Sequence, residues 1–245
     1  MARMAAEAGT TDLVATPHCN SRFRFQPALI QERLEELRNA VGPVPAIHSG
    51  CELHLTPESV QDALEYPNKY TIDNRQYLLV ELADSFLPKT ITVILGNLLG
   101  GGMVPVIVHP ERNPVLQPMA DTLSEWCEMG CLIQVTAQSV SGDFGEKARH
   151  SSHRLLGLGK VHVVASDAHD IQRRPPLLGS ARREVAAKYG ESMAEALFTI
   201  NPRTIVDGGT ISTSDSRQWR KSRSAWQRFR MALVGSRDLA VPSEA

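Results

Sequence analysis

Six side chains of types that bind divalent metals follow short apolar runs in this chain. The arrangement is clearest at Asp167 and His169, which come just after the apolar run 161–165 and lie two residues apart. Alternate residues of a β-strand point the same way, so this carboxylate and this imidazole can lie side by side. The other residues that follow an apolar run in this way are His18, Glu52, Glu81 and His109.

Three imidazoles and three carboxylates without a thiolate form a mixed nitrogen and oxygen ligand set. Such a set suits Mn²⁺, Fe²⁺ or Zn²⁺, whereas cysteine is the usual ligand of a structural zinc site. Six ligands are too many for one ion that keeps an open position, so we expect two or more ions, with Glu52 and Glu81 as candidate bridges. Paired ions generate a hydroxide nucleophile and stabilise the oxygens of an in-line displacement at phosphorus.

Two arginines near these residues could bind a phosphoryl group. Arg112 comes three residues after His109, and Arg174 comes five residues after His169. Arginine binds phosphate through two parallel hydrogen bonds and stabilises the charge that develops on its oxygens, although a structural ion pair is the alternative for both side chains. No Cys-x5-Arg sequence occurs, which excludes a cysteinyl-phosphate mechanism.

The spacing of these residues predicts the architecture that positions them. The apolar runs recur about every 30 residues with helical segments between them, which is the rhythm of βα units around a parallel sheet. Runs that are apolar throughout indicate a sheet buried on both faces, and therefore a barrel with its site at the carboxyl ends of the strands. We expect helices at 1–9, 27–41, 87–99, 119–130, 144–159, 181–190 and 191–199, a chain break at Asn201-Pro202 and a last segment at 205–211.

Length and composition predict one domain followed by a tail. The 245 residues suit a single α/β barrel at 1–211, and 212–245 is expected to be a basic amphipathic or disordered tail that could touch a membrane or a partner. The net charge of −1 gives no overall attraction to nucleic acid, and no apolar run reaches the roughly 18 residues of a membrane span. The four cysteines form no disulfide framework, which favours a cytoplasmic location and packing roles.

Three other features lie outside the predicted ligand set. The basic and aromatic segment 20–25 after His18 could steer an anionic or aromatic substrate, or it could be an ordinary loop. His54 has the same strand parity as Glu52 and could reach the site, but we do not count it as a ligand. His150 and His153 have helical spacing and are expected to be exposed surface residues.

At these residues the sequence resembles a known family. The combined segments resemble the bacterial manganese-dependent protein-tyrosine phosphatases of capsule and exopolysaccharide loci, within the PHP (polymerase and histidinol phosphatase) superfamily. The resemblance covers about residues 1–211. The segments that carry it occur in this order: Thr16-Pro-His18, Gly50-Cys-Glu52, Tyr77-Leu-Leu-Val-Glu81, His109-Pro-Glu-Arg112, Ser166-Asp-Ala-His169, Arg174-Pro-Pro and Asn201-Pro-Arg.

The resemblance implies a distorted (β/α)7 barrel that binds two or three Mn²⁺ ions and hydrolyses phosphotyrosine on a tyrosine kinase of polysaccharide export. It implies that the six residues named first are the metal ligands and that Arg112 and Arg174 bind the phosphate. The family opens with a strand carrying His-x-His, which this sequence lacks, so we expect the first strand and two ligands to be missing and the activity to be impaired. A histidinol-phosphatase-like hydrolase and a non-catalytic regulatory or binding protein are the alternatives.

Overall fold

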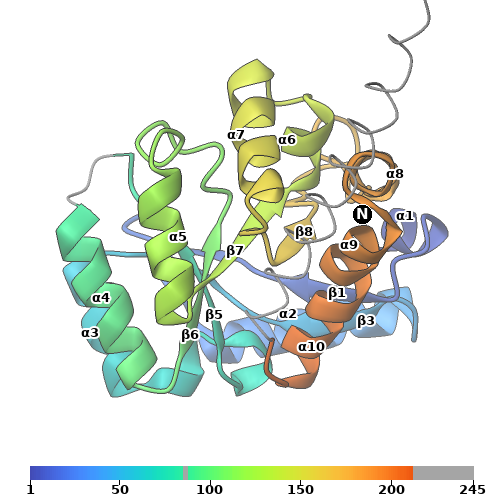
Figure 1. Ribbon diagram of the computed structural model, residues 1–245. Coiled ribbons are helices and arrows are strands. Elements are labelled where there is room, and N and C mark those ends of the chain that lie inside the picture. Colours follow the sequence, from blue (N-terminus) through green and yellow to red (C-terminus); the bar gives the residue numbers. More distant parts are fainter. Residues whose placement is uncertain (85–87, 212–245) are drawn as a thin grey trace, which may run out of the picture. The chain divides into compact units, whose positions relative to one another are not determined.

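Parallel strands alternate with helices along the part of the chain that the computed structural model describes, residues 1–84 and 88–211 (Figure 1). The expected tail, 212–245, lies outside the described residues. The strands match the six predicted apolar runs, two of which are interrupted. They are β1 (Asp12–Ala15), β2 (His18–Cys19), β3 (Ala46–Ser49), β4 (Glu52–His54), β5 (Tyr77–Glu81), β6 (Val104–Val108), β7 (Leu132–Thr136) and β8 (Val163–Ala165).

Most helices begin and end where the sequence carries a recognised signal. Proline occupies the first turn of α2, α3 and α4, where its missing N–H costs no hydrogen bond. Gly130 and Gly142, in left-handed conformations, end α5 and α6. The helices are α1 (Ala2–Glu7), α2 (Pro27–Val41), α3 (Pro57–Glu65), α4 (Pro88–Gly100), α5 (Ala120–Met129), α6 (Ala137–Ser141), α7 (Glu146–Gly157), α8 (Gly179–Tyr189), α9 (Glu191–Glu195) and α10 (Asn201–Asp207), with the short turns η1 (Pro67–Lys69) and η2 (Ile72–Asn74) and the π-helix η3 (Ala196–Ile200).

All the described strands pair in parallel. Six of them form one sheet in the order β2-β4-β5-β6-β7-β8, and β1 pairs with β3 in a second ladder that precedes β2 and β4 along the chain. Because the paired strands are parallel, each step from one strand to its neighbour is a crossover through at least one helix, as the 30-residue rhythm predicted. The parallel α/β architecture is confirmed. Among the described residues β8 does not pair with β2, so a closed barrel remains a prediction.

Both faces of the sheet are buried. On the inner face, Tyr77 and Leu79 of β5 pack with Val106 and Val108 of β6 and with side chains from β7, β8 and α10. Helices also cover the strands: α4 packs on β6, α5 packs on β7, and α2 packs on β3 of the second ladder. Each large aliphatic side chain buried in this way contributes about 1.5–3 kcal/mol, which explains why the strand sequences are apolar throughout.

The structure corrects two local expectations. The chain does not break at Asn201-Pro202, because α9, η3 and α10 run on without a gap and Pro202 lies in the first turn of α10, where it is tolerated. His153 is not an exposed surface residue: its side chain is 11% exposed and hydrogen-bonds the hydroxyl of Tyr189 and the carboxylate of Glu184. In the described part of the chain, no helix is long and apolar enough to cross a membrane.

Candidate metal centre

Four of the six predicted ligands lie where the predicted apolar runs end: Glu81 and His109 lie at the ends of β5 and β6, and His18 and Glu52 lie just after β1 and β3, at the starts of β2 and β4. His18 on β2 and Glu52 on β4 are register partners, Glu81 is the last residue of β5, and His109 directly follows β6. Because these strands are parallel, their carboxyl ends lie along one edge of the sheet. Their position at this edge is the arrangement that the spacing of the sequence predicted.

The other two ligands follow β8, at the far end of the sheet order, yet they come back to the same place. The rings of His18 and His169 have centroids 5.7 Å apart. In a flat sheet, five strand spacings of about 4.8 Å would hold β2 and β8 roughly 24 Å apart. Curvature of the sheet and the loop 166–169 together therefore bring His169 back to His18.

The centre of the cluster consists of His18, Glu52 and Glu81. One ligand atom from each residue can be chosen so that all lie within 4.8 Å of one another. His18 Nδ1 lies 2.9 Å from Glu52 Oε1, but the two buried atoms lack hydrogen-bond geometry and have no other hydrogen-bond partner among the described residues. Buried polar atoms are normally paired, so two that face each other unpaired fit a shared cation.

His109 extends this cluster toward the next strands. Its Nε2 lies 3.8 Å from Glu52 Oε1 and 3.7 Å from Glu81 Oε1. Burial alone would raise the pKa of Glu52, but the nearby imidazoles, that of His109 first, outweigh it and lower the pKa. Burial lowers the pKa of His109, but the carboxylates of Glu52 and Asp167 outweigh it and raise the pKa. Glu52 is thus held as the anion that a metal ligand must be.

Asp167 is placed differently from the other predicted ligands. Its side chain is 8% exposed, and its Oδ2 accepts hydrogen bonds from Arg112 Nη1 and Arg174 Nη2, while its Oδ1 lies 3.7 Å from His169 Nδ1. The Nε of Arg174 is buried and has no hydrogen-bond partner in the described part of the chain. The two predicted phosphate-binding arginines are therefore side by side at the site, and the Nε–H of Arg174 is available to donate a further hydrogen bond.

Two of these residues have strained backbones. His109 has φ of 37° and Asp167 has φ of 49°, values that non-glycine residues rarely adopt. Each such conformation costs on the order of 1–3 kcal/mol and tends to occur where function requires it. The strained turns are held by main-chain hydrogen bonds, from His109 N to Gln134 O at 2.9 Å and from His169 N to Arg174 O at 3.0 Å. The surrounding structure fixes these two side chains at the strand ends.

The family model for capsular polysaccharide synthesis, CpsB/CapC, matches residues 1–207. The chain belongs to this family. It is 32% identical over 207 residues to the tyrosine-protein phosphatase CpsB of Streptococcus pneumoniae, with 81% of this chain and 85% of that protein covered. It is 31% identical over 215 residues to the tyrosine-protein phosphatase YwqE of Bacillus subtilis, with 86% and 84% covered.

The fold agrees with this membership. A crystal structure from work on YwqE of Bacillus subtilis and CpsB of Streptococcus pneumoniae, described as unique metal-dependent tyrosine phosphatases, superposes with a TM-score of 0.80. The two sequences are 28% identical, and the match covers 86% of this chain and 87% of that one. The family predicted from the sequence segments is therefore confirmed.

Two further residues of this CpsB/CapC member lie at the site. His54 on β4 is the register partner of Glu81, and its Nδ1 lies 3.4 Å from Glu81 Oε2. His54 has the same strand parity as Glu52, and this signal in the sequence could have placed it among the site residues. The ring of Phe144 lies 4.6 Å from Arg112 Cζ and 5.8 Å from Arg174 Cζ. Nothing in the spacing of the sequence pointed to Phe144.

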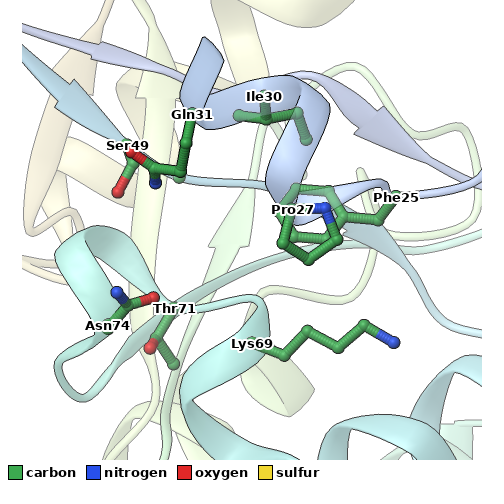
Figure 2. A pocket seen from close by; sticks show the side chains of 9 residues that line it. Phe25, Pro27, Ile30, Gln31, Ser49, Lys69, Thr71 and Asn74 are labelled. Atoms are coloured by element: carbon green, nitrogen blue, oxygen red, sulfur yellow. The ribbon is translucent and has the colours of Figure 1, made fainter. Parts of the chain in front are cut away.

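A separate small pocket lies between the start of α2, the end of β3 and the η1–η2 segment. Figure 2 shows its lining, which includes Phe25, Pro27, Ser49, Lys69 and Asn74. Its volume of about 30 Å³ can hold a water molecule or two. A phosphotyrosine side chain would not fit, so this pocket is not the substrate site.

Proposed function

We propose that this CpsB/CapC family member is a metal-dependent protein-tyrosine phosphatase of capsular polysaccharide synthesis. The proposal is carried by one observation: unpaired imidazole and carboxylate atoms gather at the strand ends beside two adjacent arginines. Anionic and imidazole ligands suit divalent cations, and paired guanidiniums suit a phosphoryl group. The names of the relatives support phosphotyrosine as the substrate.

In this proposal each residue has a defined role. Arg112 and Arg174 bind the equatorial oxygens of the phosphoryl group and stabilise the negative charge that builds on them. The bound ions would supply an activated water and neutralise charge on the reacting oxygens. The residues that hold the ions are His18, Glu52, Glu81, His109, Asp167 and His169.

Asp167 has two sets of partners in this scheme. Its Oδ2 accepts from both arginines, which keeps the guanidiniums at the site before substrate binds. Its other oxygen, Oδ1, lies 3.7 Å from His169 Nδ1 and would act as the ligand of an ion. The unpaired Nε of Arg174 supplies a further donor to the phosphoryl oxygens.

The finer parts of the proposal concern the metal, the fold and the partner. Nitrogen and oxygen ligands without thiolate favour two or three Mn²⁺ ions, with Fe²⁺ or Zn²⁺ as substitutes. The curvature that brings His169 to His18 supports a distorted (β/α)7 barrel. We propose as substrate a phosphotyrosine protein, namely a tyrosine kinase of polysaccharide export, in the cytoplasm, where the four free cysteines would remain reduced.

The test is hydrolysis of a phosphotyrosine peptide by the purified chain with added Mn²⁺. We expect release of inorganic phosphate that chelation by EDTA abolishes, and much slower release from phosphoserine peptide and from histidinol phosphate. His109→Ala should lose activity, whereas the control His150→Ala, at an exposed position on α7, should keep it. Preference for histidinol phosphate would assign the chain to the other hydrolase, and peptide binding without turnover would identify a regulatory protein.

A further inference from the structure

Phe144 lies in a short turn between α6 and α7 whose shape is fixed by its neighbours. The flanking Gly142 and Gly145 have φ of 91° and 86°, which a residue with a side chain rarely adopts. A Cβ added at Gly142 would lie 3.1 Å from Cδ of Arg149, so the turn also packs closely against α7. Asp143 N donates to Gln138 O at 2.9 Å and Gly145 N to Gly142 O at 2.9 Å. The half-buried ring is therefore presented from a well-defined backbone.

The ring contacts both predicted phosphate-binding side chains. Its centroid lies 4.6 Å from Arg112 Cζ and 5.8 Å from Arg174 Cζ, both within the range of a cation–π interaction. The same two guanidiniums donate hydrogen bonds to Asp167. Each cation is thus in contact with both a carboxylate and an aromatic ring.

These two contacts have different consequences for phosphate binding. A carboxylate uses the N–H donors that a phosphoryl group also needs, so the two acceptors compete. An aromatic ring attracts the cation without accepting those conventional N–H bonds, so it can stay in contact when the donors turn to phosphate. A free arginine side chain loses conformational entropy when it binds an anion. A fixed ring that already restricts the side chain reduces this entropy loss.

We propose that Phe144 is a positioning residue that holds Arg112 and Arg174 in place as their N–H donors pass from Asp167 to the phosphoryl group of the substrate. The inference rests on the proposed phosphatase function, because it assigns the two arginines to phosphate. It names a residue that contributes to phosphate affinity and turnover through the arginines. The alternative is that the ring only packs the turn between α6 and α7.

The test compares Phe144→Leu, which removes the aromatic face but keeps an apolar side chain, with Phe144→Tyr, which keeps the face. The control is Phe198→Leu, the same change at a half-buried phenylalanine in η3. Binding of inorganic phosphate is measured by calorimetry with Mn²⁺ present, together with hydrolysis of phosphotyrosine peptide, bound Mn²⁺ and thermal unfolding.

For Phe144→Leu we expect phosphate affinity and kcat/KM to fall about 3- to 30-fold, which at 1.36 kcal/mol per tenfold is about 0.7–2 kcal/mol. Bound Mn²⁺ should not change. Phe144→Tyr should lose less than Phe144→Leu, and Phe198→Leu should bind phosphate like the unmodified protein. In a background of Arg112→Ala with Arg174→Ala, Phe144→Leu should have almost no further effect.

Three results would overturn the inference. They are unchanged phosphate affinity in Phe144→Leu, equal losses in the leucine and tyrosine variants, and a full loss in the background without the arginines. The phosphatase proposal fails separately, if the unmodified protein does not release phosphate from the peptide. The affinity of the variants for inorganic phosphate still tests Phe144 in that case.

Discussion

Replacing Asp167 with asparagine should weaken both the fold and the metal site. The carboxylate accepts hydrogen bonds from Arg112 and Arg174, and breaking a buried ion pair costs about 3–5 kcal/mol. The two arginines are 28% and 23% exposed, so water offsets part of that cost, and asparagine keeps one oxygen acceptor. We expect Asp167→Asn to lower the free energy of unfolding by about 1–3 kcal/mol. For a domain of this size, that is a fall in Tm of about 2–12 °C.

The response to metal should change as well. At a Mn²⁺ concentration 100 times Kd, binding stabilises a protein by about 2.7 kcal/mol. If the lost ligand weakens affinity about 10- to 100-fold, the stabilisation at the same concentration falls to roughly 0.4–1.4 kcal/mol. The variant should therefore start with a lower Tm and gain less from added metal than the unmodified protein.

The assay is thermal unfolding followed by circular dichroism, with EDTA and across a Mn²⁺ titration. Asp121→Asn, the same change at an exposed position on α5, is the matched control and should behave nearly like the unmodified protein. Hydrolysis of phosphotyrosine peptide by Asp167→Asn should fall by orders of magnitude. An unchanged Tm in EDTA together with an unchanged gain from Mn²⁺ would refute both roles assigned to Asp167.

Three other predictions follow from the site and the core. Arg112→Lys and Arg174→Lys should each lower kcat about 10- to 100-fold with bound metal unchanged, because lysine lacks the planar guanidinium that makes two parallel hydrogen bonds to phosphate. An unchanged kcat with a lower Tm would indicate that these arginines only form structural ion pairs. Hydrolysis should be unchanged after alkylation of the cysteines with iodoacetamide and in Cys19→Ala, because no cysteine is expected to act as the nucleophile. Loss of hydrolysis in either case would indicate a thiol nucleophile. Burial lowers the pKa of His162 to about 4, so as the pH falls this imidazole is protonated in the unfolded chain before it is protonated in the folded protein. The free energy of unfolding therefore falls by up to about 3 kcal/mol between about pH 6.5 and pH 4. His162→Gln should make the free energy of unfolding, measured with urea, depend less on pH in this range. An unaltered pH dependence would contradict the role assigned to His162.

The strand ends could be predicted from the sequence because they follow from a short-range rule. A buried parallel strand is apolar throughout, so its end is marked by the first polar or charged residue. Glu52 and Glu81 were found in this way: Glu81 ends β5, and Glu52 follows the apolar run 46–51 and pairs with Leu79. The 30-residue spacing then gave the order of the strands, because consecutive βα units usually lie side by side.

Contacts between loops could not be predicted in the same way. Phe144 and Arg174 are far apart in sequence, and only the packing of α6, α7 and the turn after β8 brings the ring near the guanidinium. Pro202 was misjudged for a related reason. Proline disrupts a helix interior but is accepted in a first turn, and the sequence does not reveal where α10 begins.

The curvature of the sheet connects these local features to catalysis. Of the side chains that would hold the ions, His18, Glu52 and Glu81 lie on β2, β4 and β5, and His109 follows β6. Asp167 and His169 follow β8, and the loops after β6 and β8 also carry Arg112 and Arg174. In a flat sheet β8 would lie roughly 24 Å from β2, and the four residues from Ala165 to His169 could span only about 13 Å of that distance. His18 and His169, at 5.7 Å, show that bending removes this gap. A change that flattened the sheet should therefore abolish hydrolysis even with every proposed ligand and both arginines intact.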